Sequence, residues 1–149
     1  MSLQRKLGPL GLLCAVILVA CASTNSSGGA FRKSNAPSPS ESVVQRQLEA
    51  YNRHDLEAFL ATYAEDVKLY RMPSAEPTIS GKAQLGEFYR RSRFNLPALH
   101  AQVVHRAVLG NKVVDHERVF GLKKDAVDAV AVYAIADGRI VTVWLFYPD

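Results

Sequence analysis

The sequence has 149 residues, with 18 Lys and Arg against 14 Asp and Glu and a formal net charge of +4. A basic balance of this kind would suit a nucleic-acid-binding protein. All of the excess, however, lies before the first acidic residue, Glu41, and the part from Glu41 onward is formally neutral. We therefore expect no nucleic-acid partner. The length and the 48% hydrophobic content predict one ordinary globular domain.

The first residues have the layout of an export signal. Arg5 and Lys6 form a charged start, and residues 7–22 that follow contain no charged side chain. This apolar run is shorter than the roughly 18 residues that a membrane-spanning helix needs. Its end, Leu18-Val19-Ala20-Cys21, resembles the lipobox of bacterial lipoproteins, in which signal cleavage leaves an acylated cysteine at the new N-terminus.

The lipobox resemblance implies a division of the N-terminal region. Residues 1–20 would be a lipoprotein signal peptide, Cys21 would be the lipidation site that carries a fatty acid such as palmitate, and residues 21–40 would be a flexible, Ser- and Pro-rich tether. The protein would then be anchored in the bacterial cell envelope, and Ala22 after the cysteine favours the outer membrane, facing the periplasm. The alternative is an ordinary cleaved signal in which Cys21 occurs by chance.

From residue 41 onward the hydrophobic pattern predicts helices first and strands afterwards. Apolar residues three or four positions apart predict helices over 42–51, 55–66 and 81–91, with Asp55 as the N-cap of the second. Alternating residues predict strands over 67–71, 99–109, 112–120, 126–135 and 139–147, joined in part by turns at Gly110-Asn111 and Asp137-Gly138. This order predicts an α+β domain over 41–149, with three N-terminal helices packed on one face of a mainly antiparallel sheet.

Three segments of this domain together resemble a known family. They are residues 44–56, Tyr63-Ala64-Glu65-Asp66-Val67, and Gly81 with the helix that holds Phe88-Tyr89. The family that they resemble is the nuclear transport factor 2 superfamily, in particular its SnoaL-like and ketosteroid-isomerase-like branch. It covers about residues 42–147 and implies a curved sheet that wraps around helices to form a conical cavity. It also implies a homodimer formed through the sheet. A shared scaffold does not identify a reaction, since this one hosts isomerases, epoxide hydrolases, cyclases and proteins without catalysis.

The catalytic residues of two well-known members of this superfamily are not retained. Ketosteroid isomerase is a standard example of an enzyme that tunes the pKa values of its catalytic groups. Comparison with it places Gln47 at the tyrosine position, Arg71 at the general base and Ala131 near the second aspartate. Tyr51, one helical turn beyond Gln47, could supply a hydroxyl. The limonene-type epoxide hydrolase comparison matches Arg118 to that enzyme's arginine, whereas the remaining positions fall on Leu69, Arg71, Phe120 and Leu145.

The register of the strand 112–120 decides which side chains face the cavity. In the register of the epoxide hydrolase comparison, His116, Arg118 and Phe120 share the cavity face with Leu69 and Arg71, and the two arginines would bind a carboxylate or phosphate. In the other register, Asp115 and Glu117 turn inward, where they would neutralise Arg71 or act as an acid or base. The third interpretation makes the charged side an ordinary solvated face with His116 on the surface.

Three functions are compatible with these residues. The first is a lipid-anchored domain that binds a small hydrophobic or amphipathic, even acidic, molecule in a cavity whose wall also includes Tyr133. The second is a cofactor-free isomerase, hydrolase or cyclase that uses His116, Asp115 or Glu117 as acid or base. The third is a non-catalytic dimeric scaffold of the envelope. Because no second His or carboxylate stands at ligand spacing, we expect no metal and no cofactor.

Overall fold

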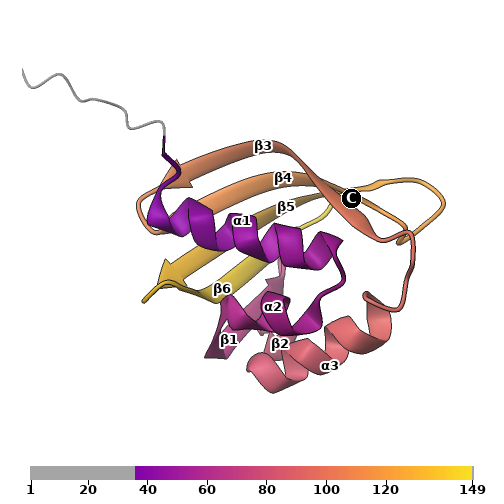
Figure 1. Cartoon of the computed structure of the whole chain (residues 1–149), viewed down its shortest axis with the longest axis horizontal. Coiled ribbons are helices and arrows are strands. Elements are labelled where there is room, and N and C mark those ends of the chain that lie inside the picture. The colour runs from indigo at the N-terminus through magenta and orange to yellow at the C-terminus, as the bar shows by residue number, and fades with distance from the viewer. Residues whose placement is uncertain (1–35, 149) are drawn as a thin grey trace, which may run out of the picture. The chain divides into compact units, whose positions relative to one another are not determined.

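The computed structural model describes residues 36–148, which form a curved sheet with helices on one face (Figure 1). The helices are α1 (Pro39–Asn52), α2 (Leu56–Ala61) and α3 (Lys82–Ser92). The strands are β1 (Tyr63–Arg71), β2 (Ile79–Ser80), β3 (His100–Leu109), β4 (Lys112–Phe120), β5 (Val127–Ala136) and β6 (Arg139–Phe146). The predicted α+β class is confirmed. The expectations for residues 1–35, including the signal peptide, Cys21 and most of the tether, lie outside the described residues.

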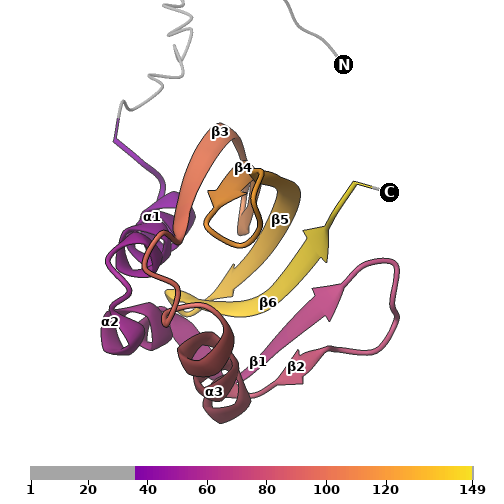
Figure 2. The ribbon, with the colours of Figure 1, turned by 90° about the vertical axis from the view of Figure 1, so that its right-hand side faces the viewer.

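The six strands form one sheet in the order β2-β1-β6-β5-β4-β3. Every neighbouring pair is antiparallel except β1 and β6, which run parallel and join the first strand of the domain to the last. Figure 2 shows the sheet bending around α1, α2 and α3, which all lie on its concave side. The cone-shaped arrangement implied by the family resemblance is therefore confirmed.

Local capping explains where the helices begin. α1 starts at Pro39, three residues before the predicted start, because the side chain of Ser38 accepts a hydrogen bond from the Glu41 amide at 3.1 Å and proline suits a first helical position. Asp55 caps α2 as predicted, with its carboxylate accepting from the Ala58 amide at 3.0 Å.

The second helix is shorter than its sequence pattern predicted, and the strand after it is longer. α2 ends at Ala61, and Tyr63, which shares an apolar helical stripe with Phe59, is already in β1. The carbonyl of Thr62 accepts from the Ile140 amide at 2.9 Å, so pairing with β6 takes over from the helix at this point. The pairing of β1 with β6 thus overrides the helical spacing of apolar residues in the local sequence. Residues 74–80, for which the sequence pattern predicted neither helix nor strand, also contain β2, which pairs with β1.

An aromatic cluster fills the space between the helices and the sheet. Phe59 is fully buried, and its ring centroid lies 4.4 Å from that of Tyr89 and 5.4 Å from that of Phe94. Tyr51 lies 5.7 Å from Phe94 by the same measure. Packed rings of this size fix α1, α2 and the end of α3 against one another. Within residues 36–148 we find no helix with the length and hydrophobicity that a membrane span requires.

Candidate functional site

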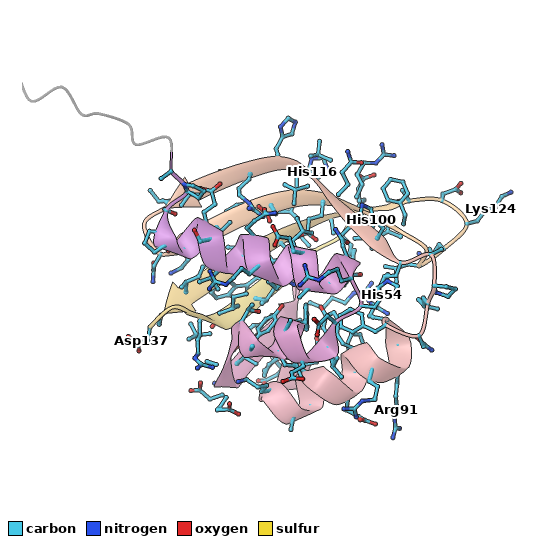
Figure 3. The ribbon with its side chains drawn as sticks, viewed as in Figure 1. His54, Arg91, His100, His116, Lys124 and Asp137 are labelled. Atoms are coloured by element: carbon cyan, nitrogen blue, oxygen red, sulfur yellow. The ribbon has the colours of Figure 1, made fainter. Side chains whose placement is uncertain are left out.

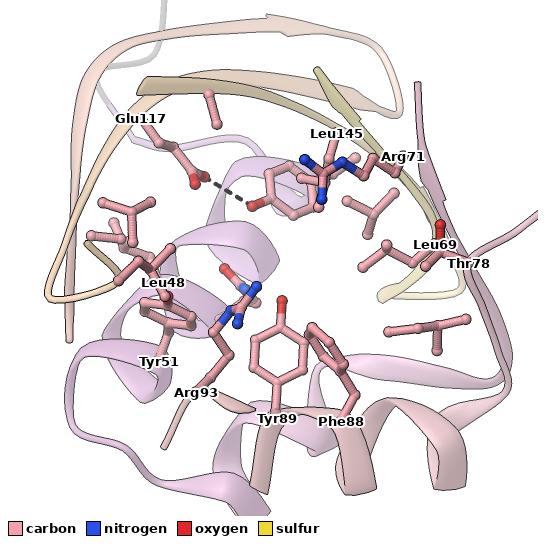
Figure 4. Close-up of a pocket in the computed structure, with 18 of the residues that line it drawn as sticks. Leu48, Tyr51, Leu69, Arg71, Thr78, Phe88, Tyr89, Arg93, Glu117 and Leu145 are labelled. Atoms are coloured by element: carbon pink, nitrogen blue, oxygen red, sulfur yellow. Dashed lines mark hydrogen bonds between the residues drawn. The ribbon is translucent and has the colours of Figure 1, made fainter. Parts of the chain in front are cut away.

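A cavity of about 220 Å³ lies between the concave face of the sheet and helices α1 and α3 (Figure 4). Most of its wall is apolar and comes from nearly every element of the fold. The apolar lining includes Leu48, Leu69, Ile79, Phe88, Val119, Val143 and Leu145. An apolar cavity with few polar groups is the usual form of a small-molecule site.

Glu117 places a carboxyl group inside this cavity. It lies on β4 and accepts a hydrogen bond from the Tyr133 hydroxyl of β5, with an O–O distance of 2.9 Å, drawn as the dashed line in Figure 4. The pKa of Glu117 is raised to about 7, mainly by burial and to a smaller degree by the Asp115 carboxylate, against the lowering effects of the Tyr133 hydrogen bond and the Arg106 charge. A carboxyl group with this pKa is present in both protonation states near neutral pH, as acid–base catalysis requires.

Asp115 points to the same side of β4 but has a structural partner. Its two carboxylate oxygens each accept a hydrogen bond at 2.7 Å, from Nε and Nη2 of Arg106 on β3. The Asp115 side chain is 1% exposed, and Nη1 of Arg106 also donates to Gln45 of α1 at 3.0 Å. The hydrogen bonds to Asp115 raise the pKa of Arg106. The pair ties α1 to the sheet and offers no free group to a ligand.

Hydroxyl and amide groups add to the polar part of the cavity. The Gln47 side-chain amide donates to the Tyr63 hydroxyl at 3.0 Å in the buried end of the cavity. Burial raises the pKa of Tyr51 and of Tyr89, so both hydroxyls stay protonated and can donate hydrogen bonds at neutral pH. Figure 4 shows the Tyr89 hydroxyl reaching into the cavity beside Arg93.

Two arginines extend from the cavity toward its outer end. The guanidinium carbon of Arg71, at the end of β1, lies 4.6 Å from the ring centroid of Tyr147. That of Arg93, just after α3, lies 4.9 Å from the ring centroid of Phe88. Both residues line the cavity. Residues 36–148 contain no group of three or more His, Cys, Asp or Glu side chains that could hold a metal ion.

Comparison with known proteins identifies the family. The family model described as SnoaL-like domain matches residues 44–143, about two thirds of the chain. The chain belongs to the SnoaL-like family. A search of curated proteins finds no match to this SnoaL-like protein.

Solved structures share the fold of the SnoaL-like domain at low sequence identity. A candidate ketosteroid isomerase from Kribbella flavida is 20% identical, with a TM-score of 0.65 over 74% of this chain and 78% of its own. A SnoaL-like protein of unknown function from Burkholderia thailandensis is 24% identical, with a TM-score of 0.63 over 76% and 98%. A Mycobacterium tuberculosis protein is 18% identical, with a TM-score of 0.66 over 76% and 93%. At this identity the likeness shows the fold alone.

Six of the cavity residues expected from the sequence do line the cavity of the SnoaL-like domain. These residues are Gln47, Tyr51, Leu69, Arg71, Tyr133 and Leu145. They come from α1, β1, β5 and β6, so the family resemblance correctly predicted that these elements surround the cavity. The same cavity wall also contains Glu117, which the sequence offered only as the alternative register.

The expectation that His116, Arg118 and Phe120 face the cavity is wrong. Side chains alternate along β4, and since Glu117 and Val119 line the cavity, these three residues point to the opposite face. Figure 3 shows His116 on the side of the sheet away from α2 and α3. There, His116 and Arg118 approach Asp128 at 3.4 and 3.6 Å. His116 is therefore not placed to act on a molecule in the cavity.

The alternative register correctly predicts that Asp115 and Glu117 turn inward, but its prediction that they neutralise Arg71 is wrong. Asp115 and Glu117 turn inward, yet Asp115 pairs with Arg106 and Glu117 bonds to Tyr133. Tyr89 and Arg93 are cavity residues that the sequence reasoning missed, and it also missed Arg106 as the partner of Asp115. Arg93 lies one residue beyond the end of α3, where φ is −133°, so its side chain leaves the direction that the helix gives to Arg90 and Arg91.

Proposed function

We propose that the SnoaL-like domain binds a small hydrophobic or amphipathic molecule in its cavity. The observation that carries this proposal is an apolar cavity of about 220 Å³ whose inner wall holds one carboxyl group, Glu117, in no ion pair. A buried carboxyl group without a cation lowers the stability of the fold, and its presence in the cavity wall supports a functional role for it.

The size of the cavity limits the class of molecule. An engineered apolar cavity of roughly 150 Å³ accepts benzene, and typical drug-sized sites measure roughly 300–1,000 Å³. The value of about 220 Å³ here lies between them. We therefore propose a ligand whose buried part is one ring with a short substituent, which is smaller than a steroid.

Binding is tested with the neutral one-ring probe 3-phenylpropanol. We expect it to raise the Tm of the purified protein in a saturable manner, since a ligand that binds only the folded state stabilises it. Ala129 lines the cavity directly opposite Glu117 in the sheet. Ala129→Leu should fill this space and abolish the shift, whereas Ala136→Leu, at the exposed end of the same strand, should keep it. Undiminished binding to a folded A129L variant would place the site elsewhere.

Glu117 supports a second candidate function, which is proton transfer on the bound molecule. As a carboxylate, Glu117 could remove a proton from a carbon next to a carbonyl group, leaving an enolate, and return the proton to carbon in an isomerisation. No cofactor is needed for such a step. The ketosteroid isomerase and epoxide hydrolase residue sets are not retained, so the general base proposed here stands at a position that neither comparison supplied.

Proton transfer is tested with phenylacetone, a one-ring ketone. We expect the protein to accelerate exchange of the hydrogens between ring and carbonyl in deuterated water, with a rate that rises with pH through about 7, as the pKa of Glu117 requires. Glu117→Gln should abolish this exchange, and Glu57→Gln on the exposed side of α2 should leave it unchanged. Equal rates in wild type and E117Q would exclude Glu117 as the base. The lipid anchor and the homodimer stay predictions.

A further inference from the structure

Arg71 and Arg93 stand at the junction of the cavity and a second, wider pocket. The outer pocket has a volume of about 740 Å³ and shares Arg71, Arg93, Leu122 and Tyr147 with the cavity. The rest of its wall comes mainly from residues 123–128, between and at the edges of β4 and β5. A molecule that extends from the cavity into the outer pocket therefore lies beside both arginines.

Neither arginine has an acidic partner within the described residues 36–148. The ion pairs of this part of the chain engage Lys82, Arg90, Arg91, Arg106, His116 and Arg118. Glu117, the carboxyl group inside the cavity, is bonded to Tyr133 instead. The charge of Arg71 and Arg93 is thus left available at the cavity opening.

Each of these guanidinium groups is held over an aromatic ring. The ring of Tyr147 supports Arg71 and the ring of Phe88 supports Arg93. A guanidinium group lies on a ring with its face, so the N–H donors along its edge remain free to bind an anion. One of the Arg93 donors is used on the Ser92 carbonyl at 2.8 Å. The other donors form no hydrogen bond within the described chain. Aromatic support of this kind orients the donors before a ligand arrives.

The rest of the outer pocket carries charges of both signs. Lys123 and Lys124 belong to its wall together with Asp125 and Asp128. Asp128 already lies 3.4 Å from His116 and 3.6 Å from Arg118 on the other face of the sheet, which reduces its effect on the pocket. Figure 3 shows Lys124 projecting from the loop that closes this end of the molecule. The positive excess of the pocket wall therefore comes from Arg71 and Arg93, and it attracts an approaching anion toward the cavity opening.

We propose that the molecule bound in the cavity is a one-ring carboxylate, with its ring inside the cavity and its carboxylate on Arg71 and Arg93. This inference rests on the proposed function and adds the charge and the orientation of the ligand. The opposite orientation is disfavoured, because a carboxylate placed deep in the cavity would meet Glu117 and, behind it, the buried Asp115. The ring, not the acid group, therefore lies nearest to Glu117.

Three probes of the same length separate charge from size. They are 3-phenylpropionate, 3-phenylpropanol and 3-phenylpropylamine, titrated by calorimetry at about pH 7.5 and low salt. Because a hydrogen bond to a charged group contributes about 1.5–3 kcal/mol, we expect the carboxylate to bind at least about tenfold more tightly than the alcohol. The amine should bind more weakly than both.

Variants of the two arginines assign the charge effect. Arg71→Gln and Arg93→Gln should each weaken binding of 3-phenylpropionate by about tenfold and leave 3-phenylpropanol within about twofold, which also reports that the cavity is still folded. Lys68→Gln is the matched control, since Lys68 is an exposed cation on the same strand as Arg71 but outside the cavity wall. It should change neither affinity.

The outcomes distinguish this inference from the proposed function. If the alcohol binds and the carboxylate binds no more tightly, or if both arginine variants keep wild-type affinity for the carboxylate, the carboxylate inference fails and the cavity site stands. If none of the three probes binds, both fail. Loss of carboxylate binding in Lys68→Gln would also contradict the assignment to Arg71 and Arg93.

Discussion

Asp115 and Glu117 lie two residues apart on the same face of β4, yet one is in an ion pair and the other is not. Asp115 is held by two hydrogen bonds from Arg106, while Glu117 has a single neutral donor, Tyr133. The difference lies in the strand opposite, since Arg106 pairs with Asp115 and Val103 pairs with Glu117. One carboxylate therefore stabilises the fold, and the other is left with its pKa near neutrality.

Glu117 should make stability depend on pH. Its pKa is about 7 in the folded protein against an ordinary value of 4.5, so the folded state binds this proton more tightly than the unfolded chain. The stabilisation is present below about pH 4.5 and is lost as the pH rises through about 7. We expect wild type to lose about 1–3 kcal/mol of unfolding free energy between about pH 5 and pH 8, relative to Glu117→Gln. Urea denaturation at both pH values measures this difference, and parallel curves for the two proteins would refute it.

Removal of the Tyr133 hydroxyl should raise the pKa of Glu117 further. The hydroxyl donates to Glu117 and lowers its pKa by stabilising the carboxylate. In Tyr133→Phe that donor is gone while the ring remains, so the pKa should rise by about one unit. Carbon-13 NMR of the Glu117 side-chain carboxyl group gives the titration directly. A fall in this pKa would show that Tyr133 does not act as the donor.

The Asp115–Arg106 pair should be important for folding. Asp115→Asn leaves Arg106, whose side chain is only 13% exposed, without its charge partner. Breaking a buried pair in this way costs about 3–5 kcal/mol. Asp128→Asn on the outer face is the control, because its ion pairs are exposed and should contribute less than about 1 kcal/mol. Similar losses in the two variants, measured by urea denaturation, would contradict the structural role of Asp115.

Gly121 should tolerate no side chain. It follows β4 with a φ of +80°, and a Cβ atom there would lie 2.4 Å from the backbone of Ala98. Gly110, in the turn between β3 and β4, also has a positive φ of +57° but has open space around it. We expect Gly110→Ala to cost about 1 kcal/mol and Gly121→Ala clearly more, since backbone atoms must move. Thermal unfolding of the two variants compares them, and equal Tm values would rule out the close contact.

Cys21 provides a prediction for the segment before the domain. If it is the lipidation site, an inhibitor of lipoprotein signal peptidase should make a larger precursor accumulate in bacteria, and metabolic labelling with a fatty acid should mark the mature protein. Cys21→Ser should abolish the labelling, whereas Cys14→Ser should not, because Cys14 would leave with the signal peptide. Labelling that persists in Cys21→Ser would disprove the lipobox assignment.

The sequence predicted the fold well because the elements from Ser42 onward follow regular periods. The short strand β2 was not predicted. The other elements agree with the structure in order and class to within a few residues, except where β6 draws Thr62 and Tyr63 out of the helix pattern. That exception depends on a strand more than seventy residues away in the chain. No local pattern near Tyr63 contains this information.

The site was harder to predict, because a shift of one residue in the register of β4 would turn every one of its side chains to the opposite face of the sheet. A signal was nevertheless present in the turn at Gly110-Asn111. A two-residue turn pairs Leu109 with Lys112, and counting back along the hairpin places Arg106 opposite Asp115. Because this pairing gives Asp115 a cation and allows it to be buried, it would have favoured the register in which Asp115 and Glu117 turn toward the cavity side. The bulge after Val103 and the position of Arg93 beyond α3 carry no such signal.

The parallel pairing of β1 with β6 has a consequence for how the protein is made. The last strand occupies an interior position of the sheet and separates β1 and β2 from β5, β4 and β3. Until β6 has been synthesised, the two parts of the sheet have no shared edge, and Val143 and Leu145 are missing from the cavity wall. Contacts between such distant segments form late and slow folding. A nascent chain that lacks β6 therefore has no complete cavity for a ligand. Only a chain in which β6 has joined the sheet can be stabilised by ligand binding.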